Sequence, residues 1–312
     1  MDIIFFGSDN FAVPSLKAIL ASGHKISCVI TQPDQKKGRG LSLGATAIKV
    51  VAKEANLKIY QPEQINTSEV TNLLKGLKPD LFVVVAYGQI LSQKILDIPK
   101  ILPINIHASI LPKYRGAAPI NWTIINAEKN TGITIIKMVK EMDAGPIILQ
   151  KTVDVADDDT AITLEDKLSH LAADLLLITL ASIEDRNYKL MPQDKDNVIF
   201  APKLKKEDGR INWSNPAYNI SNLIRGCLPW PGAFTYYKGK LLKIYKAKVS
   251  SGVLRFVSSL PGEIVNVSKE GIAVATGKDN LIIEELQIEG KRRMRVEEFI
   301  AGHKIYVGEA LE

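Results

Sequence analysis

Short apolar runs alternate with amphipathic stretches of about ten residues through the first 107 residues of the chain. We predict strands at MDIIFF, HKISCVIT, LKIY, DLFVVVAY and ILPINIH, and helices at FAVPSLKAILASG, ATAIKVVAKEAN and SEVTNLLKGL. The β-branched run DLFVVVAY is typical of a parallel strand that is buried on both faces. Strands that alternate with helices in this way favour an α/β fold, a doubly wound parallel sheet with right-handed crossovers.

The pattern changes after Thr131. GITIIKMVK and GPIILQKTVDV are predicted to be strands paired at a sheet edge or in a hairpin, and a long helix is expected from Thr163 to Ile183. One more helical stretch, SNPAYNISNLIRG, precedes the short alternating segments LLKIYKAKVS, GEIVNVS, GIAVATG and LIIEELQ. Their spacing of about ten residues, with glycine at the turns, is typical of a small barrel or sandwich. We therefore expect a first domain over residues 1–190, a charged, proline-containing linker over 191–208 and a β-domain over 209–312.

The composition is that of an ordinary globular chain: 312 residues, of which 46% are hydrophobic. No run approaches the ~18 uncharged apolar residues that a membrane helix needs, and the chain enters a strand pattern directly after Met1 without a basic leader. We expect a cytoplasmic protein that does not associate with membranes. Cys28 and Cys227 lie far apart in apolar surroundings, which is typical of buried free thiols.

Positive charge is concentrated in the last third of the chain. The formal net charge is +6, and residues 204–312 hold 17 lysines and arginines against 12 acidic residues. The densest cluster is GKRRMR, with Lys291, Arg292, Arg293 and Arg295. A run of this kind is often only a solvated face, but with the charge asymmetry it favours contacts to the phosphate backbone of a nucleic acid. A second basic segment, QPDQKKGRG, is predicted to be a mobile loop that carries Lys36, Lys37 and Arg39.

The segment ILPINIH ends in two polar residues that face the same side. Asn105 and His107 are two positions apart, so in a strand their side chains point together, at the carboxyl end where open α/β sheets bind ligands. An amide and an imidazole aimed at one point can donate hydrogen bonds to a developing oxyanion. Asp143, in the MDAGP turn, is the candidate third group, because a carboxylate near His107 favours the imidazolium and can move a proton.

Each of these residues also has a structural interpretation. A single histidine at a strand end is more often hydrogen-bonded for structural reasons than catalytic, and an aspartate in a turn often serves the turn. The loop FFGSDNF lies between a strand and a helix, but it lacks the Gly-x-Gly-x-x-Gly pattern and so argues only weakly for a dinucleotide. The four histidines have no spacing typical of metal ligands, so we expect no metal site.

The segment NIHASILPKYRGAAPINW, followed by GITIIKMVKEMDAGPI, resembles the signature of the folate-dependent formyltransferases. The resemblance implies a Rossmann-like catalytic domain, with Asn105, His107 and Asp143 in the active site. It also implies 10-formyltetrahydrofolate as the co-substrate, bound near Ser109, Ile110, Leu111 and Pro112. This family includes members that act on nucleotides, sugars and tRNA, so the signature alone does not name the acceptor.

Further segments resemble the branch of the family that formylates initiator methionyl-tRNA for translation initiation. They are FFGSDNFAVPSL, TQPDQKKGRG, APKLKKEDGRINW, IRGCLPWPGAF and LQIEGKRRM, so the resemblance spans nearly the whole chain. It implies a carboxyl-terminal OB-like barrel that binds tRNA through its basic cluster, with Arg39 at the acceptor end. We expect a monomer.

The implied reaction is attack of the neutral α-amino group of methionine on the formyl carbon, through a tetrahedral oxyanion. Asn105 and His107 would stabilise the oxyanion, and Asp143 would orient His107 and assist proton transfer. Two alternatives stay open. A formyltransferase for a nucleotide-linked amino sugar explains the three polar residues but not the basic β-domain, and a tRNA-binding protein without catalysis explains the β-domain but not the three residues.

Overall fold

The computed structural model describes residues 1–37, 42–250 and 260–312, and the side chains of residues 36–43 are not described. The described residues form two compact units. The first comprises Met1–Pro119, Asn130–Asp154 and Glu165–Pro202, and the second comprises Ile120–Lys129, Val155–Leu164 and Lys203–Glu312. The units therefore differ from the predicted boundaries, since residues 191–202 of the predicted linker pack with the first unit and two short early segments pack with the second.

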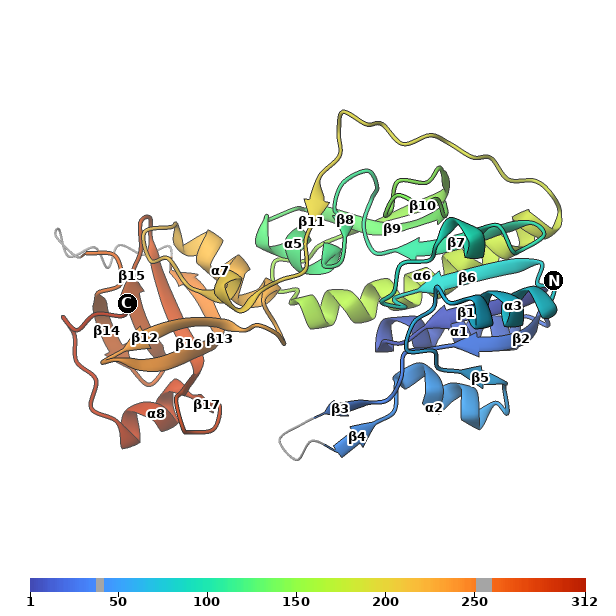
Figure 1. The fold of residues 1–312 in the computed structure, drawn as a ribbon. Helices are drawn as coiled ribbons and strands as arrows, with labels where there is room; N and C mark the ends of the chain where they lie inside the picture. The colour runs from blue at the N-terminus through green and yellow to red at the C-terminus, as the bar shows by residue number, and fades with distance from the viewer. Residues whose placement is uncertain (38–41, 251–259) are drawn as a thin grey trace. The chain divides into compact units, whose positions relative to one another are not determined.

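A seven-stranded sheet forms the centre of the first unit as described, with the order β10-β9-β7-β6-β1-β2-β5 (Figure 1). The strands are β1 (Asp2–Gly7), β2 (Lys25–Ile30), β5 (Ile59–Tyr60), β6 (Leu81–Val85), β7 (Leu102–His107), β9 (Asn130–Lys137) and β10 (Ile147–Asp154). Strands β7, β6, β1, β2 and β5 are parallel, while β9 and β10 add an antiparallel edge. The predicted doubly wound sheet and its terminal hairpin are confirmed.

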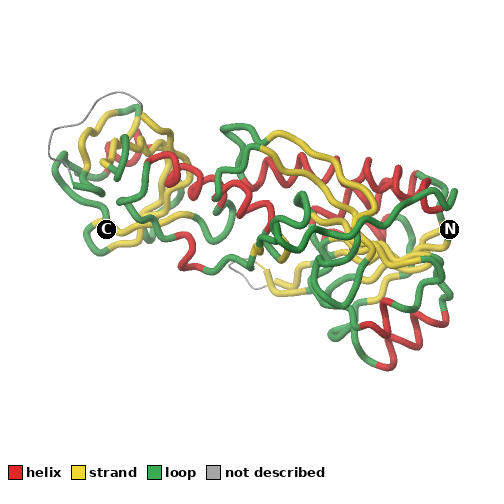
Figure 2. The backbone as a smooth tube through the Cα atoms, turned by 90° about the horizontal axis from the view of Figure 1, so that it is seen from above, coloured by secondary structure: helices red, strands yellow, loops and turns green. Residues whose placement is uncertain are grey.

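Helices lie on both sides of the strands in this unit (Figure 2). They are α1 (Val13–Ala21), α2 (Ala47–Glu54), α3 (Ser68–Gly76), α4 (Gln93–Leu96) and α6 (Ala161–Glu184), with a short 3-10 turn at Asn10–Ala12. Alternate residues of β1, such as Ile4 and Phe6, pack with α3 and α4, while Ile3 and Phe5 are buried on the opposite face. Burial on both faces explains why these strands are continuous apolar runs.

The order of the strands places a ligand-binding edge beside β1. From β1 the chain adds β2 and β5 on one side, then returns to add β6 and β7 on the other. In such sheets ligands bind at the carboxyl ends of the strands, near the point where the order reverses. His107 is the last residue of β7 and therefore lies at this edge.

The second unit is built on an antiparallel sheet of order β12-β13-β16-β15-β14, with β17 paired to β16. Its elements are α5 (Pro119–Ile125), η2 (Lys206–Gly209), α7 (Ala217–Gly226), β12 (Ala233–Tyr237), β13 (Lys240–Ser250), β14 (Ile264–Ser268), β15 (Gly271–Ala275), β16 (Asn280–Ile288), β17 (Met294–Arg295) and α8 (Val296–Gly302). The segments from earlier in the chain join α7: Asn121 donates to the carbonyl of Gly226, and the Arg225 guanidinium donates to the carbonyl of Asp159. The predicted small β-domain is confirmed.

The last residues of the chain close this sheet. Glu312 exchanges two backbone hydrogen bonds with Tyr236 of β12, and Leu311 and Glu309 bond to Gly262 and Ile264 at the β14 edge. The two edge strands are thereby joined through residues 309–312. Closure removes free strand edges, which in an open sheet are sites of unwanted pairing.

Glu309 adds a pH-dependent contact to this closure. Its carboxylate lies 2.7 Å from Lys238 Nζ and accepts a hydrogen bond from Tyr237 Oη, and these contacts lower the pKa of Glu309 to about 2. A depressed carboxyl pKa stabilises the fold above the ordinary value near 4.5, and this stabilisation is lost as the pH falls towards 2. We expect Glu309→Gln to lower the Tm of the full chain at pH 7, with a difference that shrinks below pH 4.5.

Thermal unfolding of the parent and the variant between pH 7 and pH 2.5 measures this effect. Glu297→Gln is the matched control, because Glu297 is an exposed glutamate of the same unit. A difference in Tm between the parent and Glu309→Gln that stays constant across this range would rule out the carboxylate contact as its source.

Several elements were not predicted. The segment predicted to be a loop, residues 32–40, contains β3 (Gln35–Lys37), which pairs with β4 (Ser42–Gly44) just after it, so that part of the prediction was wrong. It failed because the two strands have only three residues each, QKK and SLG, which is too short to show an alternation of apolar and polar residues. Helices α4 and α8 and the short strands β8 (Arg115–Gly116) and β11 (Phe200–Ala201) were also missed.

Cys28 and Cys227 are buried free thiols, as predicted, and burial raises their pKa values to about 11 and about 12. No helix in the described part of the chain combines the length and the apolar character needed to cross a membrane.

Candidate active site

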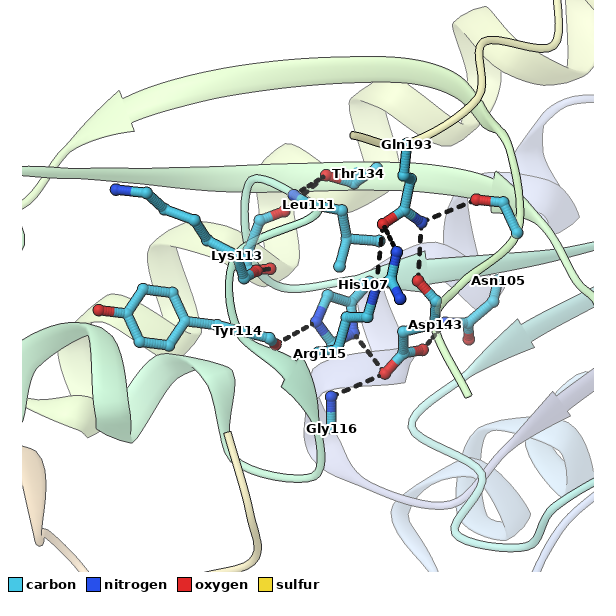
Figure 3. A network of polar contacts seen from close by, with 12 residues as sticks. Asn105, His107, Leu111, Lys113, Tyr114, Arg115, Gly116, Thr134, Asp143 and Gln193 are labelled. Atoms are coloured by element: carbon cyan, nitrogen blue, oxygen red, sulfur yellow. Dashed lines mark hydrogen bonds and ion pairs between the residues drawn. The ribbon is translucent and has the colours of Figure 1, made fainter. Parts of the chain in front are cut away.

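The imidazole of His107 and the carboxylate of Asp143 face each other at the carboxyl end of β7 (Figure 3). His107 Nδ1 lies 3.5 Å from Asp143 Oδ2, and the two side chains are only 6% and 11% exposed. An electrostatic interaction at this distance with little solvent around it is screened weakly. The two predicted residues are therefore brought together, although 36 positions separate them in the sequence.

A second contact fixes the tautomer of His107. Its Nε2 lies 2.8 Å from the carbonyl oxygen of Tyr114. A carbonyl only accepts, so Nε2 carries a hydrogen and Nδ1 is the nitrogen that gains or loses a proton. The titrating nitrogen thus faces Asp143. Because Nε2 is bonded to Tyr114, the ring of His107 has no free N–H on that side to offer a reacting group.

The carboxylate of Asp143 also contacts Asn105 and Gly116. The amide Nδ2 of Asn105 lies 3.4 Å from Oδ1, and the backbone N–H of Gly116 donates to Oδ2 at 2.9 Å. An amide nitrogen carries two hydrogens, so Asn105 keeps a second donor for another acceptor. The structure brings Asn105, His107 and Asp143 into one cluster, as the strand spacing predicted for the first two.

The turn around Asp143 has an unusual backbone. Asp143 adopts a φ of 52°, in the left-handed region, where residues other than glycine are uncommon and aspartate is among the better tolerated. Two residues later, a Cβ on Gly145 would lie 1.7 Å from the carbonyl oxygen of Lys137, so only glycine allows this close approach to β9. The Asp-Ala-Gly sequence is therefore needed to bring the carboxylate to His107.

Sequence analysis missed one side chain that contacts this turn and a second that contacts the first. Gln193, from the segment predicted to be a linker, donates to the carbonyls of Asp143 and Gly145. Arg115 in turn donates to the side-chain oxygen of Gln193. The sequence MPQDKD gives no signal for this role, because the contact partners lie about 50 and 78 positions away.

The loop implied to bind folate is tied to β9 and β10. Ser109 donates to the carbonyl of Lys113, and Thr134 donates to the carbonyl of Ser109 and accepts from the amide of Leu111. Ser109 and Leu111 are buried, whereas Ile110 and Pro112 are half-buried. Of the four residues, Ile110 and Pro112 are thus the ones with exposed surface to offer a ligand.

The basic candidates have different surroundings. Arg292 forms an ion pair with Glu298, and Arg293 pairs with Glu285 and lies over the ring of Tyr245. Lys291 and Arg295 are exposed, and no carboxylate among the described residues pairs with their side chains. Lys36 and Lys37 lie in β3, where the structure describes only their backbone, and Arg39 lies outside the described residues.

This arrangement suits acyl transfer between two amines. Asn105 supplies a hydrogen-bond donor, His107 supplies a titratable nitrogen, and Asp143 supplies an acceptor for protons, all in a largely buried cluster. In the described ranges, no group of three or more histidine, cysteine, aspartate or glutamate residues has the arrangement of a metal site.

Comparison with known proteins agrees with this chemistry. The family model described as formyl transferase matches residues 1–180, and that of the formyl transferase C-terminal domain matches residues 203–304. The methionyl-tRNA formyltransferase of Alkaliphilus oremlandii is 47% identical over 311 residues, covering 100% of this chain and 99% of that protein. That of Acetivibrio thermocellus is 44% identical, with the same coverage.

Solved structures show the same fold. The methionyl-tRNA formyltransferase from Clostridium thermocellum aligns with a TM-score of 0.56 at 18% identity, covering 81% of this chain and 95% of that one. The sugar 3N-formyl transferase WlaRD aligns with a TM-score of 0.69 at 21% identity, covering 94% and 99%. With both parts of the chain matched by family models and with full-length relatives above 40% identity, the chain belongs to the formyl transferase family, among the methionyl-tRNA formyltransferases.

Proposed function

We propose that the chain transfers the formyl group of 10-formyltetrahydrofolate to the α-amino group of methionine on initiator methionyl-tRNA, for translation initiation. The observation that carries the proposal is the close approach of His107 and Asp143 at the carboxyl end of β7, in a chain that belongs to this family. The reaction needs groups that can accept and donate a proton, because the attacking amine must lose a proton and the leaving nitrogen must gain one.

The reaction forms one bond and breaks one. The neutral amine of methionine attacks the formyl carbon, and the carbonyl oxygen becomes an oxyanion. The bond from this carbon to N10 of the folate then breaks, and a proton passes from the attacking nitrogen to N10. The site must therefore stabilise a negative oxygen and carry a proton between two nitrogens.

We assign the proton transfer to Asp143 and the stabilisation of the oxyanion to Asn105 and His107. Asp143 accepts the proton of the attacking amine and returns it to N10. The second N–H of Asn105 donates to the oxyanion, an interaction that is typically worth a few kcal/mol in a site without water. His107 is held by Tyr114 and faces Asp143, and when its ring is protonated its charge favours the negative oxygen electrostatically.

The folate is assigned to the loop from Ser109 to Pro112. Ile110 and Pro112 supply apolar surface, while Ser109 and Leu111 hold the loop in shape through their bonds to Lys113 and Thr134. Neutral apolar walls with few polar groups are typical of sites for planar ligands. We further propose that the chain acts as a monomer, in the cytoplasm where its tRNA acceptor is found.

The tRNA contacts are assigned to two basic regions, which are Lys36, Lys37 and Arg39 early in the chain and Lys291, Arg292, Arg293 and Arg295 in the second unit. Contacts of this type position the tRNA through its phosphates. Lys291 and Arg295 are expected to contribute most, because Arg292 and Arg293 each share their charge with a glutamate.

Replacing both Lys291 and Arg295 by Ala is expected to weaken tRNA binding and to reduce its dependence on salt. Each phosphate contact contributes roughly 0.7 to 0.9 to the slope of log K against log salt concentration, so the slope should fall by about 1.5. The double variant of Arg292 and Arg293 should show a smaller change. Binding measured from 50 to 300 mM salt tests this.

Lys269 and Lys278, two exposed lysines of the same unit, are replaced by Ala as the control for net charge. The KM for the folate should not change in any of these variants. A salt slope that is the same for the parent and for the variant lacking Lys291 and Arg295 would show that this cluster is only solvated.

The proposed activity is tested by formylation with labelled 10-formyltetrahydrofolate. Initiator and elongator methionyl-tRNA are compared side by side, with an amino sugar nucleotide as a third acceptor. We expect rapid transfer to the initiator and much slower transfer to the other two. Transfer to the sugar alone would replace this proposal, and binding of tRNA without transfer to any acceptor would indicate a protein that only binds tRNA.

A further inference from the structure

The turn that carries Asp143 is held from a distant part of the chain by one amide side chain. Gln193 Nε2 donates to the carbonyl oxygens of Asp143 and Gly145, both at 2.7 Å. Gln193 Oε1 accepts from Arg115, at 3.0 Å from Nε and 2.7 Å from Nη2. Figure 3 shows this side chain reaching the turn from the side opposite the carboxylate.

All four hydrogen-bonding positions of this amide are therefore used, since an amide has two N–H donors and an oxygen with two lone pairs. The partners lie on both sides of the Asp143 carboxylate. Asp143 and Gly145 belong to the turn itself, while Arg115 precedes Gly116, whose N–H donates to Asp143 Oδ2. Through Arg115, the Gln193 amide thus links the turn that carries the Asp143 carboxylate to the segment whose Gly116 N–H binds that carboxylate.

The turn needs a restraint of this kind. Asp143 has a φ of 52°, and its backbone is in a conformation that an L-residue leaves easily unless other contacts hold it. Close packing of Gly145 against the carbonyl oxygen of Lys137 limits movement of the turn towards β9. The two bonds from Gln193 fix the carbonyls on either side of Ala144, which leaves the peptide planes of the turn little freedom to rotate.

Gln193 is itself anchored at both ends of its segment. Two residues before it, Met191 exchanges backbone hydrogen bonds with Ile147 of the β10 strand. Eight residues after it, the short β11 strand pairs with β8, and the carbonyl of Ala201 accepts from Ala118. Because the segment is bound to the first unit on both sides, Gln193 presents a fixed amide to the turn.

We propose that Gln193 is a positioning residue for formyl transfer, which keeps the carboxylate of Asp143 at its working distance from His107. The inference rests on the proposed function. It gives a positioning role in catalysis to a segment whose sequence indicates only a linker. Gln193 acts through Asp143 and not by contact with the reacting atoms.

The first test is the kinetic effect of Gln193→Met and Gln193→Glu. Methionine has about the length of glutamine but makes none of its hydrogen bonds. Glutamate can still accept from Arg115, but it places an oxygen that cannot donate against the carbonyls of Asp143 and Gly145. We expect either change to lower kcat about 10- to 100-fold, because small displacements of catalytic groups cost that much, while both KM values change less than threefold. Asn197→Ala is the control, since Asn197 is an exposed amide in the same segment that donates to the side chain of Asp194.

The second test separates positioning from general stability. In an Asp143→Asn background, Gln193→Met should change kcat less than twofold, because the carboxylate that it positions is already gone. An undiminished loss in that background, or parental activity of Gln193→Met alone, would overturn the proposal. If Gln193→Met lowers the Tm by several degrees, Gln193→Glu, which keeps the contact with Arg115, decides the question.

A readout without catalysis distinguishes this inference from the proposed function. Amide hydrogen exchange of residues 141–146 should increase in Gln193→Met and not in Asn197→Ala. Unchanged exchange would refute the restraint even in an active enzyme. A parent protein that transfers no formyl group but shows the increase would refute the proposed function and leave the restraint on the turn established.

Discussion

Asp143→Asn is expected to lower the rate of formyl transfer about 100- to 1,000-fold, with KM values for folate and tRNA within threefold of the parent. The change removes the negative charge that accepts the proton of the amine, and loss of a proton-transfer group typically costs two to four orders of magnitude. Single-turnover transfer from labelled 10-formyltetrahydrofolate measures this rate directly.

Asparagine is the informative substitution at this position because it preserves the turn. It tolerates the left-handed backbone at least as well as aspartate, and the carbonyls bound by Gln193 are unchanged. Asp185→Asn, at an exposed position after α6, is the control for loss of one carboxylate. A rate for Asp143→Asn within threefold of the parent would exclude the carboxylate from the reaction.

His107→Ala is expected to lower turnover at least ~100-fold, since it removes the imidazole proposed to stabilise the oxyanion and the partner of Asp143. His107→Gln adds a distinction, because its amide can still donate to the carbonyl of Tyr114 but carries no charge. We expect His107→Gln to be nearly as slow as His107→Ala. Steady-state rates at saturating substrates provide the comparison.

The control for His107 is His170→Ala. His170 is an exposed histidine of α6 whose ring bonds to Asp166 of the same helix, so its replacement should leave turnover unchanged. Should His107→Gln turn over as fast as the parent, the imidazole would serve to hold Tyr114 in place and its charge would have no part in the reaction.

The layout of the sheet was predictable because its strands are buried. A strand covered by helices on both faces must be apolar throughout, as in β1 and β6, and the helices between such strands show their own periodicity. Asn105 and His107 were predictable for a local reason as well, since two positions in one strand fix a common direction.

The contacts that complete the site depend on distant segments and leave no local pattern. The pairing of β8 with β11 involves two residues from each strand, too few to show alternation. Gln193 occupies a polar, proline-containing stretch whose composition is that of a linker, yet its amide is bound on all sides. Amino-acid composition indicates solvent exposure but not hydrogen-bonding partners, so it predicted neither the β8–β11 pairing nor the contacts of Gln193.

The ion pairs of the basic cluster were not predicted, for a similar reason. A run of four cations within five residues predicts a strong positive surface, but the fold brings Glu285 and Glu298 to two of them. Glu285 lies on β16, which pairs with β17 directly beside the cluster. Exposed ion pairs of this kind are weak, typically below about 1 kcal/mol, so they reduce the net charge of the cluster without locking it.

The account centres on His107 and Asp143 acting as one unit, and the rate of the variant that lacks both side chains tests this most directly. Groups that work as a unit show losses that do not multiply. Single-turnover formylation of initiator methionyl-tRNA by His107→Ala combined with Asp143→Asn should be at most about threefold slower than the slower single variant. Losses that multiply, to a combined ~10,000-fold or more, would show two groups acting independently and would contradict the account.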